Sequence, residues 1–234
     1  MYTNRQEFLK KRYDPINNRT ILRYQEDARL KPILSVLKEA RVPIKLLDIG
    51  CYDGHIGFLL KKKFGKKCEV YGIDVANNSI KLARKRGIHA KVCDVTVRIN
   101  FEDNMFDYIF AGEIIEHLQD TDFFMCEVKR VLKPNGTLIL TTPNFLSLGR
   151  RIYYLFGKGI YMEASFSLPE NAAGHIRYFT FETLKELLSY HNFESTISFS
   201  EAVSFPGFDS NILAKIFPTF GRSIIMFSRN KKTK

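Results

Sequence analysis

The sequence predicts an α/β fold, in which a doubly wound, mostly parallel sheet of seven strands carries an insertion after the fifth strand. Short, almost wholly apolar segments alternate with segments of helical periodicity, which is typical of a parallel sheet covered on both faces. The length of 234 residues suits one domain, or one domain with a modest insertion. Hydrophobic residues make up 45% of the chain and charged residues 26%, so a disordered or collagen-like chain is excluded.

Each element follows from the local pattern of apolar and turn-forming residues. The predicted strands are 45–50, 69–74, 90–93, 106–111, 137–142, 195–199 and 223–228. The predicted helices are one that starts after the glycine-rich turn at 50–57 and ends near residue 64, and those at 77–86, 120–132 and 180–191. Gly87 fits a helix C-terminal stop, and Thr180 fits an N-cap.

The remaining segments define the expected domain organisation. Residues 1–44 are expected to form a polar helical lead-in that ends before Pro43. Residues 45–234 are expected to form a single domain. The segments near 144–176 and 201–221 are too long for routine connections, and they are predicted to be lid-like insertions rich in tyrosine and phenylalanine.

The charge balance bears on possible partners. The chain holds 36 lysine and arginine residues against 25 aspartate and glutamate residues, which gives a formal net charge of +11. This favours a polyanionic partner such as nucleic acid, anionic lipid head groups or a phosphorylated substrate. Basic residues gather within 1–45, 61–67 and 229–234. Few aromatic residues accompany them at stacking spacing, so an ordinary solvated surface is the competing interpretation.

The cysteine pattern and the N-terminal segment bear on the compartment. Four cysteines, Cys51, Cys68, Cys93 and Cys126, lie far apart without a CxxC pair, which argues against a zinc cluster or a disulfide framework. The first residues lack the apolar stretch of a secretory signal, and no apolar run approaches the ~18 residues of a membrane span. A cytoplasmic location is therefore expected.

Four consecutive predicted strands end in an acidic residue or a glycine turn. Asp48 and the turn to Gly54 follow the first strand, Asp74 the second, Asp94 the third, and Gly112-Glu113 the fourth. In doubly wound sheets, ligands bind at this carboxyl edge. The dinucleotide and P-loop fingerprints are absent, and a pyrophosphate would avoid so much negative charge. These acids suit a ligand with hydroxyls, an amine and positive charge but no phosphate, such as S-adenosylmethionine.

Five segments of the sequence resemble, in order, the motifs of class I S-adenosylmethionine-dependent methyltransferases. They are LLDIGCYDG (46–54), YGIDVA (71–76), VCDVT (92–96), FDYIFAGEIIEHL (106–118) and RVLKPNGTLILTTPN (130–144). The likeness covers roughly residues 44–145 and the segment 175–193. It implies a Rossmann-like methyltransferase fold and S-adenosylmethionine as cofactor.

The resemblance also implies a set of cofactor-binding residues. Asp74 is expected to accept hydrogen bonds from both ribose hydroxyls, and Asp94 from the adenine amine with Val95 beside the ring. Tyr52 departs from the family, which usually has glycine there, so its side chain must point away from the cofactor or lie over it. The full expected set is Asp48, Gly50, Cys51, Tyr52, Asp53, Gly54, Asp74, Val75, Asp94, Val95, Gly112 and Glu113.

The candidates for chemistry on the acceptor are Glu113, Glu116, His117 and His175. If residues 113–117 begin a helix, the spacings of three and four place their side chains on one face. With His175 they could bind a divalent metal that lowers the pKa of an acceptor hydroxyl, a pattern that resembles metal-assisted O-methyltransferases. A general base without metal and a purely structural role are the two alternatives.

The sequence leaves three functions open. The first is O-methylation of a small-molecule, carbohydrate or lipid-linked acceptor, with peripheral membrane contact through the insertions. The second is metal-assisted 2′-O-methylation of RNA, which the basic clusters favour. The third is a non-catalytic scaffold that binds the cofactor. A DNA partner is not expected.

Overall fold

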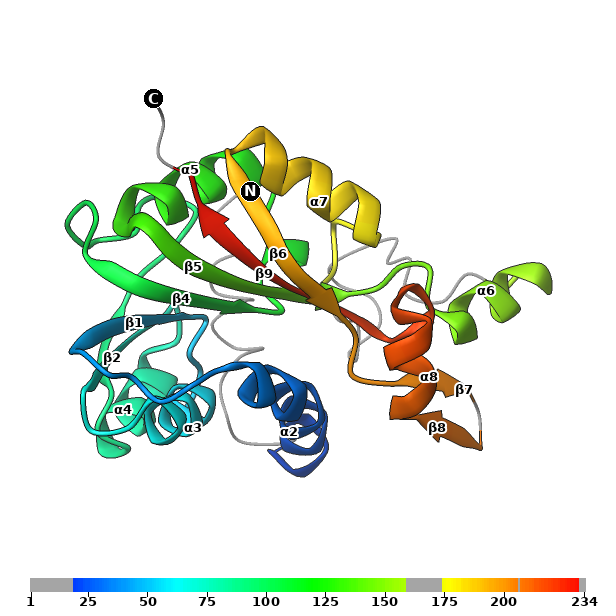
Figure 1. Cartoon of the computed structure of the whole chain (residues 1–234), viewed down its shortest axis with the longest axis horizontal. Helices are drawn as coiled ribbons and strands as arrows, with labels where there is room; N and C mark the ends of the chain where they lie inside the picture. Colours follow the sequence, from blue (N-terminus) through cyan, green and yellow to red (C-terminus); the bar gives the residue numbers. More distant parts are fainter. Residues whose placement is uncertain (1–18, 159–173, 206, 232–234) are drawn as a thin grey trace.

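The computed structural model describes residues 19–158, 174–205 and 207–231, with side chains from residue 28 onward. Its centre is a seven-stranded sheet in the order β3-β2-β1-β4-β5-β9-β6 (Figure 1). Neighbouring strands from β3 to β5 run parallel, whereas β9 is antiparallel to both β5 and β6. The predicted doubly wound, mostly parallel sheet is confirmed.

The elements occur in regular alternation along the first two thirds of the chain. The strands of the sheet are β1 (Ile44–Ile49), β2 (Cys68–Asp74), β3 (His89–Val92), β4 (Phe106–Gly112), β5 (Leu132–Pro143), β6 (Phe193–Phe199) and β9 (Ser223–Asn230). The α-helices are α2 (Arg19–Val36), α3 (His55–Phe64), α4 (Asn77–Lys85), α5 (Thr121–Val131), α6 (Leu148–Leu155), α7 (Phe181–Tyr190) and α8 (Asn211–Ile216). A hairpin of β7 (Val203–Phe205) and β8 (Phe208–Ser210) and two 3-10 helices, η1 (Ile115–His117) and η2 (Pro218–Phe220), complete the described part.

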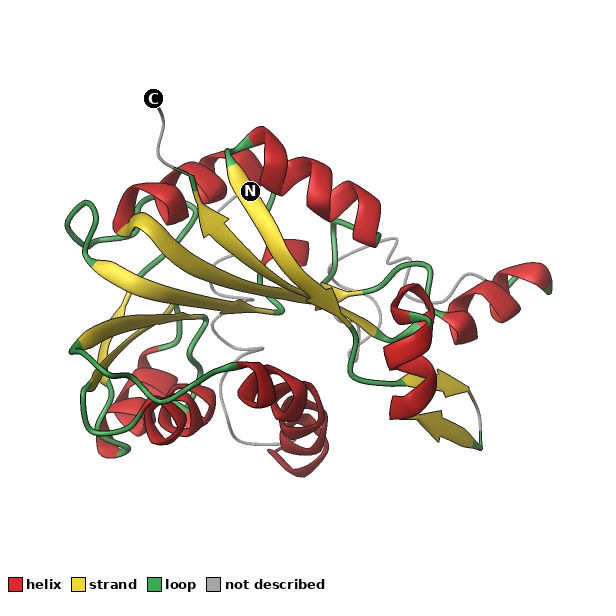
Figure 2. Ribbon diagram, viewed as in Figure 1, coloured by secondary structure: helices red, strands yellow, loops and turns green. Residues whose placement is uncertain are grey.

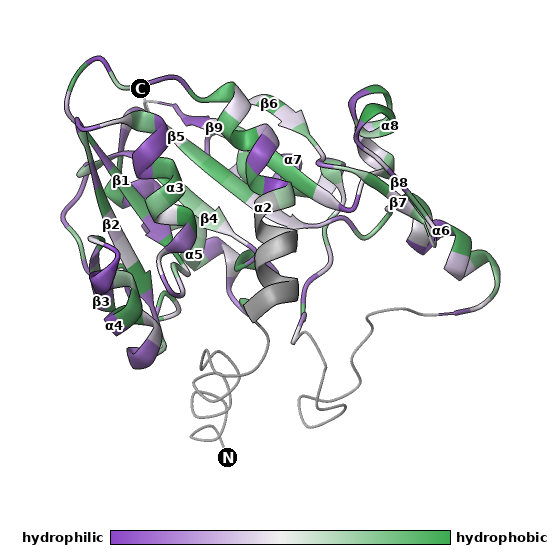
Figure 3. Ribbon diagram, turned by 90° about the horizontal axis from the view of Figure 1, so that it is seen from below, coloured by the Kyte–Doolittle hydropathy of each residue, from purple (hydrophilic) through white to green (hydrophobic). Residues whose placement is uncertain are grey.

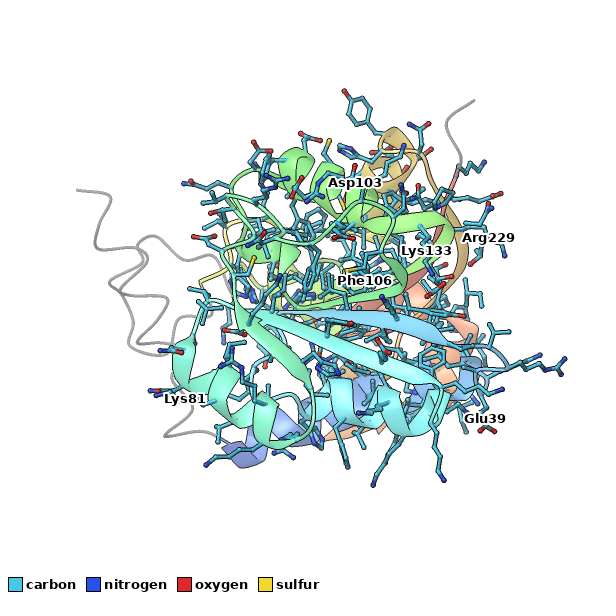
Figure 4. The ribbon with its side chains drawn as sticks, turned by 90° about the vertical axis from the view of Figure 1, so that its left-hand side faces the viewer. Glu39, Lys81, Asp103, Phe106, Lys133 and Arg229 are labelled. Atoms are coloured by element: carbon cyan, nitrogen blue, oxygen red, sulfur yellow. The ribbon has the colours of Figure 1, made fainter. Side chains whose placement is uncertain are left out.

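Helices cover both faces of the sheet (Figure 2). On one face α5 and α7 pack against a cluster that contains Leu47 and Ile49, and on the other face α2, α3 and α4 pack against a cluster that contains Leu46. This alternation along β1 is the period-2 pattern of a strand buried on both sides. Apolar residues accordingly run along the strands in the middle of the molecule, as Figure 3 shows. Phe106 at the start of β4 is fully buried, whereas Lys81 lies at the periphery (Figure 4).

The helix α2 is part of the domain and not a separate appendage. Leu30, Ile33 and Leu37 are buried in the same cluster as α3 and α4, as their helical spacing predicts. Residues 1–18 of the expected lead-in lie outside the described residues. The described lead-in therefore adds a third helix to one face of the sheet.

Two regions differ from the elements that the sequence predicts. Strand β5 begins at Leu132 and not at residue 137, because Leu132 already pairs with Phe106, and a register shift separates this pair from the pair of Tyr108 and Thr137. The segment 201–221 holds the hairpin β7–β8, α8 and η2, none of which the sequence indicates. Of the expected insertion at 144–176, residues 159–173 lie outside the described residues.

Among the helices that the structure describes, none combines the length and the apolar character needed to cross a bilayer.

Candidate active site

The strand order reverses between β1 and β4, and doubly wound sheets bind their ligands at the carboxyl ends of the strands on either side of such a point. The turn from β1 to α3 passes this point with three residues in the left-handed region: Gly50 with φ 72°, Tyr52 with φ 46° and Gly54 with φ 77°. Tyr52 thus adopts a backbone conformation that glycine enters freely and that costs a tyrosine about 1 kcal/mol. This conformation fits the glycine that the resemblance implies at this position.

Asp74, at the end of β2, holds this turn in place. Its Oδ2 accepts a hydrogen bond from the Tyr52 backbone N–H at 3.0 Å, and its Oδ1 accepts one from the Ala76 N–H at 2.8 Å. Burial raises the pKa of Asp74, and these backbone hydrogen bonds oppose the shift. Each carboxylate oxygen has a second lone pair, so the fixed carboxylate can accept further hydrogen bonds from a ligand.

Asp94 and Asp48 are also held by local contacts. Asp94 Oδ1 accepts hydrogen bonds from the Thr96 N–H and hydroxyl at 2.9 and 2.6 Å, and Val95 beside it is buried. Asp48 is buried beneath the start of α3, where a Cβ on Gly57 would lie 3.0 Å from its Oδ2. Gly57 therefore makes room for the carboxylate.

Cys51 and Asp53, two of the predicted cofactor residues, direct their side chains into the protein. Cys51 packs in the core cluster beneath the turn, and burial followed by the charges of Asp48 and Asp74 raises the pKa of its thiol. Asp53 is buried and forms an ion pair with Arg86 at 2.9 Å. Only the backbone of these two residues is then left to line the turn.

Glu113 follows the end of β4 in a left-handed conformation with φ 54°, and this corrects the expected helix over 113–117. The observed helix is the 3-10 helix η1, which starts only at Ile115. Glu113 instead faces α2, where Arg29 Nη1 lies 2.5 Å from its Oε2, and its Oε1 accepts a hydrogen bond from Thr141 at 3.1 Å. Gly112 before it has no room for a side chain, because a Cβ there would lie 2.6 Å from the Phe110 ring.

Glu116 is buried below this turn. Its Oε2 accepts a hydrogen bond from the Thr142 hydroxyl at 3.0 Å, whereas its Oε1 accepts none from the described residues. Burial, followed by the negative charge of Glu113, raises the pKa of Glu116 well above the usual glutamate range. The carboxyl group is thus poised to take up a cation or to stay protonated.

Two histidines complete a cluster around Glu116. The Glu116 Oε1 lies 4.0 Å from His117 Nε2 and 3.9 Å from His175 Nε2, and the two rings are 4.9 Å apart. His117 Nδ1 lies 3.0 Å from the Gly174 carbonyl, an acceptor that fixes the N–H on Nδ1 of a neutral ring. The Glu116 carbonyl accepts backbone hydrogen bonds from Ile176 and Arg177, which anchors the segment that carries His175.

The comparison with family models decides the family. A model described as a methyltransferase domain matches residues 42–196, which is most of the sheet. The chain belongs to this methyltransferase domain family. The resemblance to class I S-adenosylmethionine-dependent methyltransferases is thereby confirmed.

Individual relatives of the chain are more distant. The chain is 28% identical over 156 residues to a demethylmenaquinone methyltransferase of Staphylococcus aureus, which covers 64% of each protein. It is 31% identical over 127 residues to the mitochondrial ubiquinone biosynthesis O-methyltransferase of Rattus norvegicus, which covers 50% of this chain and 36% of that protein. The chain thus spans less than two thirds of the length of either relative.

A solved structure shows the same fold over nearly the whole chain. It is that of an S-adenosylmethionine-dependent methyltransferase from Thermotoga maritima, with a TM-score of 0.66 at 18% identity, covering 98% of this chain and 96% of that one. At this identity the likeness concerns the fold alone.

The structure brings together only part of the metal set that the sequence predicts. Among the described residues, ligand atoms of Glu116, His117 and His175 lie within 4.8 Å of one another. Glu113 is outside this group, because its carboxylate is engaged with Arg29 and Thr141. Two imidazole nitrogens and one carboxylate oxygen are a donor set that fits a divalent transition metal.

Sequence reasoning missed three residues of the candidate site. Thr141 and Thr142 orient the two glutamates, and Arg29 neutralises one of them. The threonines could have been found, because they lie near the end of β5. This is the same sheet edge that the ends of four earlier strands indicate as the site. Arg29 could not, because its partner is far along the chain and no motif marks it.

Proposed function

We propose that the chain is an S-adenosylmethionine-dependent methyltransferase that acts on a hydroxyl oxygen of a small-molecule, carbohydrate or lipid-linked acceptor. The observation that carries this proposal is the position of the Glu116–His117–His175 cluster. It follows β4, whose Ala111 pairs with Ile49 of β1, and a Cβ on Gly50 would lie 3.3 Å from Ile114. The Asp74-anchored turn and the cluster are therefore adjacent.

The residues at this edge fit the cofactor. Asp74, already fixed by two backbone N–H groups, is positioned to accept the ribose hydroxyls, and Asp94 to accept the adenine amine. Arg29 brings a guanidinium with five N–H donors to a site lined by acids, so it can hold the methionine carboxylate. The bound cofactor supplies a methyl group, whose transfer forms a C–O bond and leaves the electron pair of the broken C–S bond on sulfur.

The acceptor hydroxyl must lose its proton as its oxygen attacks. His117 carries its proton on Nδ1 toward the Gly174 carbonyl, so the lone pair of this neutral ring lies on Nε2, which can accept the hydroxyl proton. The Nε2 of His175 lies at the same distance from Glu116 and is the second proton acceptor in reach. Ionised Glu116 would then stabilise the imidazolium that forms.

A metal-assisted transfer is the second candidate, and the donor set favours it. Glu116 Oε1, His117 Nε2 and His175 Nε2 would hold a divalent cation, which would lower the pKa of the acceptor hydroxyl. The Gly174 carbonyl would accept the Nδ1–H of His117 and so orient its ring, as backbone carbonyls do for many metal-bound histidines. The raised pKa of Glu116 makes binding of such a cation release a proton.

The names of two relatives support a quinone-like acceptor. Both the staphylococcal and the rat protein are named for steps on menaquinone or ubiquinone precursors. Such acceptors combine an aromatic ring with an isoprenoid tail, so they belong to the lipid-linked class proposed above. RNA remains the competing acceptor because of the basic balance of the chain.

Calorimetric titration of the full chain with S-adenosylhomocysteine tests the cofactor site. We expect micromolar binding, weakened about tenfold or more in Asp74→Asn, which keeps the shape of the side chain but loses the charged acceptor. Glu102→Gln, which removes an exposed acid elsewhere, should bind like the wild type. Wild-type affinity in Asp74→Asn would contradict the assigned site, and no binding to the wild-type chain would overturn the proposed function.

The same titration with manganese or zinc separates the two candidates. A metal heat that is lost in His117→Ala selects the metal-assisted transfer, whereas cofactor binding without a metal heat selects the base-assisted one. Radiolabelled methyl transfer to a catechol, a sugar and an RNA oligonucleotide then identifies the acceptor class. We expect transfer to the catechol. Cofactor binding without transfer to any of the three would instead indicate the non-catalytic scaffold.

A further inference from the structure

One end of the molecule exposes an unusual number of large apolar side chains. They belong to the hairpin β7–β8, to α8 and to the residue after it, and we call them the apolar tip: Phe205, Phe208, Ile212, Ile216 and Phe217. Figures 1 and 3 both place α8, β7 and β8 together at the end away from β1, β2 and β3. Isolated exposed apolar residues are ordinary, but five within thirteen residues on one small module mark an interaction surface.

The helix α8 shows that this exposure is built into the local structure. The Ser210 side chain caps the helix by accepting from the Leu213 N–H at 3.2 Å, and Ala214 is buried against the module. The opposite side of α8 carries Ile212 and Ile216, one turn apart and 72% and 61% exposed. An ordinary surface helix has polar residues on that side. The outward face of α8 is therefore apolar by sequence and not through a gap in the packing.

The tip is a firm part of the fold. The ring of Phe217 stacks on that of Phe220 with 5.8 Å between their centroids. The guanidinium of Arg151 on α6 lies over the Phe220 ring, 4.8 Å from its centroid. The helix α6 also packs on β7, where a Cβ on Gly149 would lie 3.0 Å from the Ser204 carbonyl. At the end of α6, Leu155 and Phe156 are 83% and 76% exposed. The α6 end thus adds a second apolar element to the same end of the molecule.

Basic side chains accompany these apolar residues. Lys215 lies on the exposed side of α8 between Ile212 and Ile216, and Lys158 follows the end of α6 and is exposed. The exposed acid of the module is Asp209, whose carboxylate is engaged by the Ser204 hydroxyl. Lysines can bury their methylene stems along an apolar surface and reach outward with their ammonium groups. This mixture of apolar and basic groups complements a bilayer with anionic head groups.

We propose that the apolar tip docks on the surface of an anionic bilayer. The two most exposed side chains of the tip, Ile212 and Ile216, offer no π face on which a nucleic-acid base could stack, and Lys215 is the one basic residue on α8, which argues against RNA as the occupant. A two-fold contact between two copies would place the tip against itself and bring lysine against lysine. An anionic bilayer has neither disadvantage. The docking goes beyond the proposed function, and only its consequence, access to a lipid-linked acceptor, rests on that function.

Vesicle binding tests this proposal, and the chain offers a clean probe because it contains no tryptophan. Phe217→Trp places a fluorophore in the tip. With vesicles of phosphatidylcholine that contain about a quarter phosphatidylglycerol, we expect a blue shift of its emission and quenching by brominated acyl chains. Vesicles of phosphatidylcholine alone should bind at least about tenfold more weakly. Equal binding to both vesicles would overturn the role of charge.

Two variants, each with a matched control, assign the contact to the tip. Ile212→Ser with Ile216→Ser should lower sedimentation with anionic vesicles about tenfold or more. Val42→Ser with Val97→Ser removes aliphatic side chains that are 65% and 68% exposed elsewhere, and should bind like the wild type. Lys215→Glu should weaken binding, most strongly at low salt, whereas Lys81→Glu on α4 should weaken it less.

Several outcomes would overturn the proposal. Unchanged vesicle binding of the tip double variant would show that another surface makes the contact. A wild-type dimer in sedimentation that becomes a monomer in this variant, without any vesicle binding, would make the tip an interface between copies. Displacement of the vesicles by an RNA oligonucleotide, with RNA binding lost in the tip variant, would assign it to RNA. Circular dichroism checks that each variant is folded, and titration with S-adenosylhomocysteine, read separately, distinguishes failure of docking from failure of the proposed function.

Discussion

Glu116 is a carboxyl group enclosed by Thr142, His117 and His175 with one oxygen unused by the described residues. Its folded pKa is raised by burial, so the protonated form is favoured in the native state. Its contribution to stability is therefore fully present below the unfolded pKa of about 4.3 and is lost as the pH rises through the folded pKa.

Glu116→Gln should remove this pH dependence. In the presence of a chelator, the variant should gain stability relative to the wild type between pH 4 and pH 8, by on the order of 1 kcal/mol, since one pKa unit corresponds to about 1.4 kcal/mol. The amide oxygen can still accept from Thr142, so no buried hydroxyl is left without a partner. Urea unfolding at several pH values measures the difference. A constant difference across this range would show that folding leaves the pKa of Glu116 unchanged, and would contradict the raised pKa.

Individual side chains differ in how far the sequence could place them. Asp74 was predictable, because the end of a buried strand fixes both its edge and its direction. Glu113 was not predictable, because its spacing from Glu116 and His117 suggested one continuous helix. Its positive φ is not helical, and η1 begins only two residues later. Backbone conformations of this kind leave no trace in a pattern of residue types unless glycine marks them.

At the scale of elements, α2 is joined to the site by one ion pair. Arg29 Nη1 lies 2.5 Å from Glu113 Oε2, and both side chains are largely shielded from solvent. A double-mutant cycle with Arg29→Met and Glu113→Gln should give a coupling energy of about 1 kcal/mol or more, measured by urea unfolding. The reason is that each single variant leaves a shielded charge without its counterion.

A second ion pair provides the control for this cycle. Lys231, which directly follows β9, and Glu194 on β6 lie 3.6 Å apart and are both more than half exposed. The cycle of Lys231→Met and Glu194→Gln should give close to zero coupling, because water and salt screen exposed charges. Equal coupling in the two cycles would mean that the Arg29 pair does not fasten α2 to the site. Hydrogen exchange over residues 28–36 should be faster in Arg29→Met.

The elements that the sequence missed share a physical cause. The central strands and their helices are long enough for their periodicity to show, and they were placed to within a few residues. The strands β7 and β8 are three residues each, and the apolar residues of α8 point to solvent, so neither has the usual contrast between a buried and an exposed face. The predicted excursion at 201–221 marked the region but not its structure.

At the scale of the whole molecule, the two core clusters lie on opposite faces of one sheet. Leu46 and Leu47 on β1 belong to different clusters although they are neighbours in the chain, and the same holds for Ile139 and Leu138 on β5. Neither cluster can be lost without removing strands from the other. We therefore expect the described domain to unfold in one cooperative transition, in which both faces melt together.

Cofactor binding should raise the midpoint temperature of this single transition, because the site is built from the ends of strands that both clusters share. S-adenosylhomocysteine at about a hundred times its dissociation constant should add about 2.7 kcal/mol to the free energy of unfolding. For a chain of this size, that corresponds to a rise in Tm of about 5–10 °C in a calorimetric scan. Asp74→Asn should show a smaller rise at the same ligand concentration. Two transitions, of which the ligand moves only one, would instead mean that the part carrying β1, β2 and β3 unfolds separately from the part carrying β5, β6 and β9.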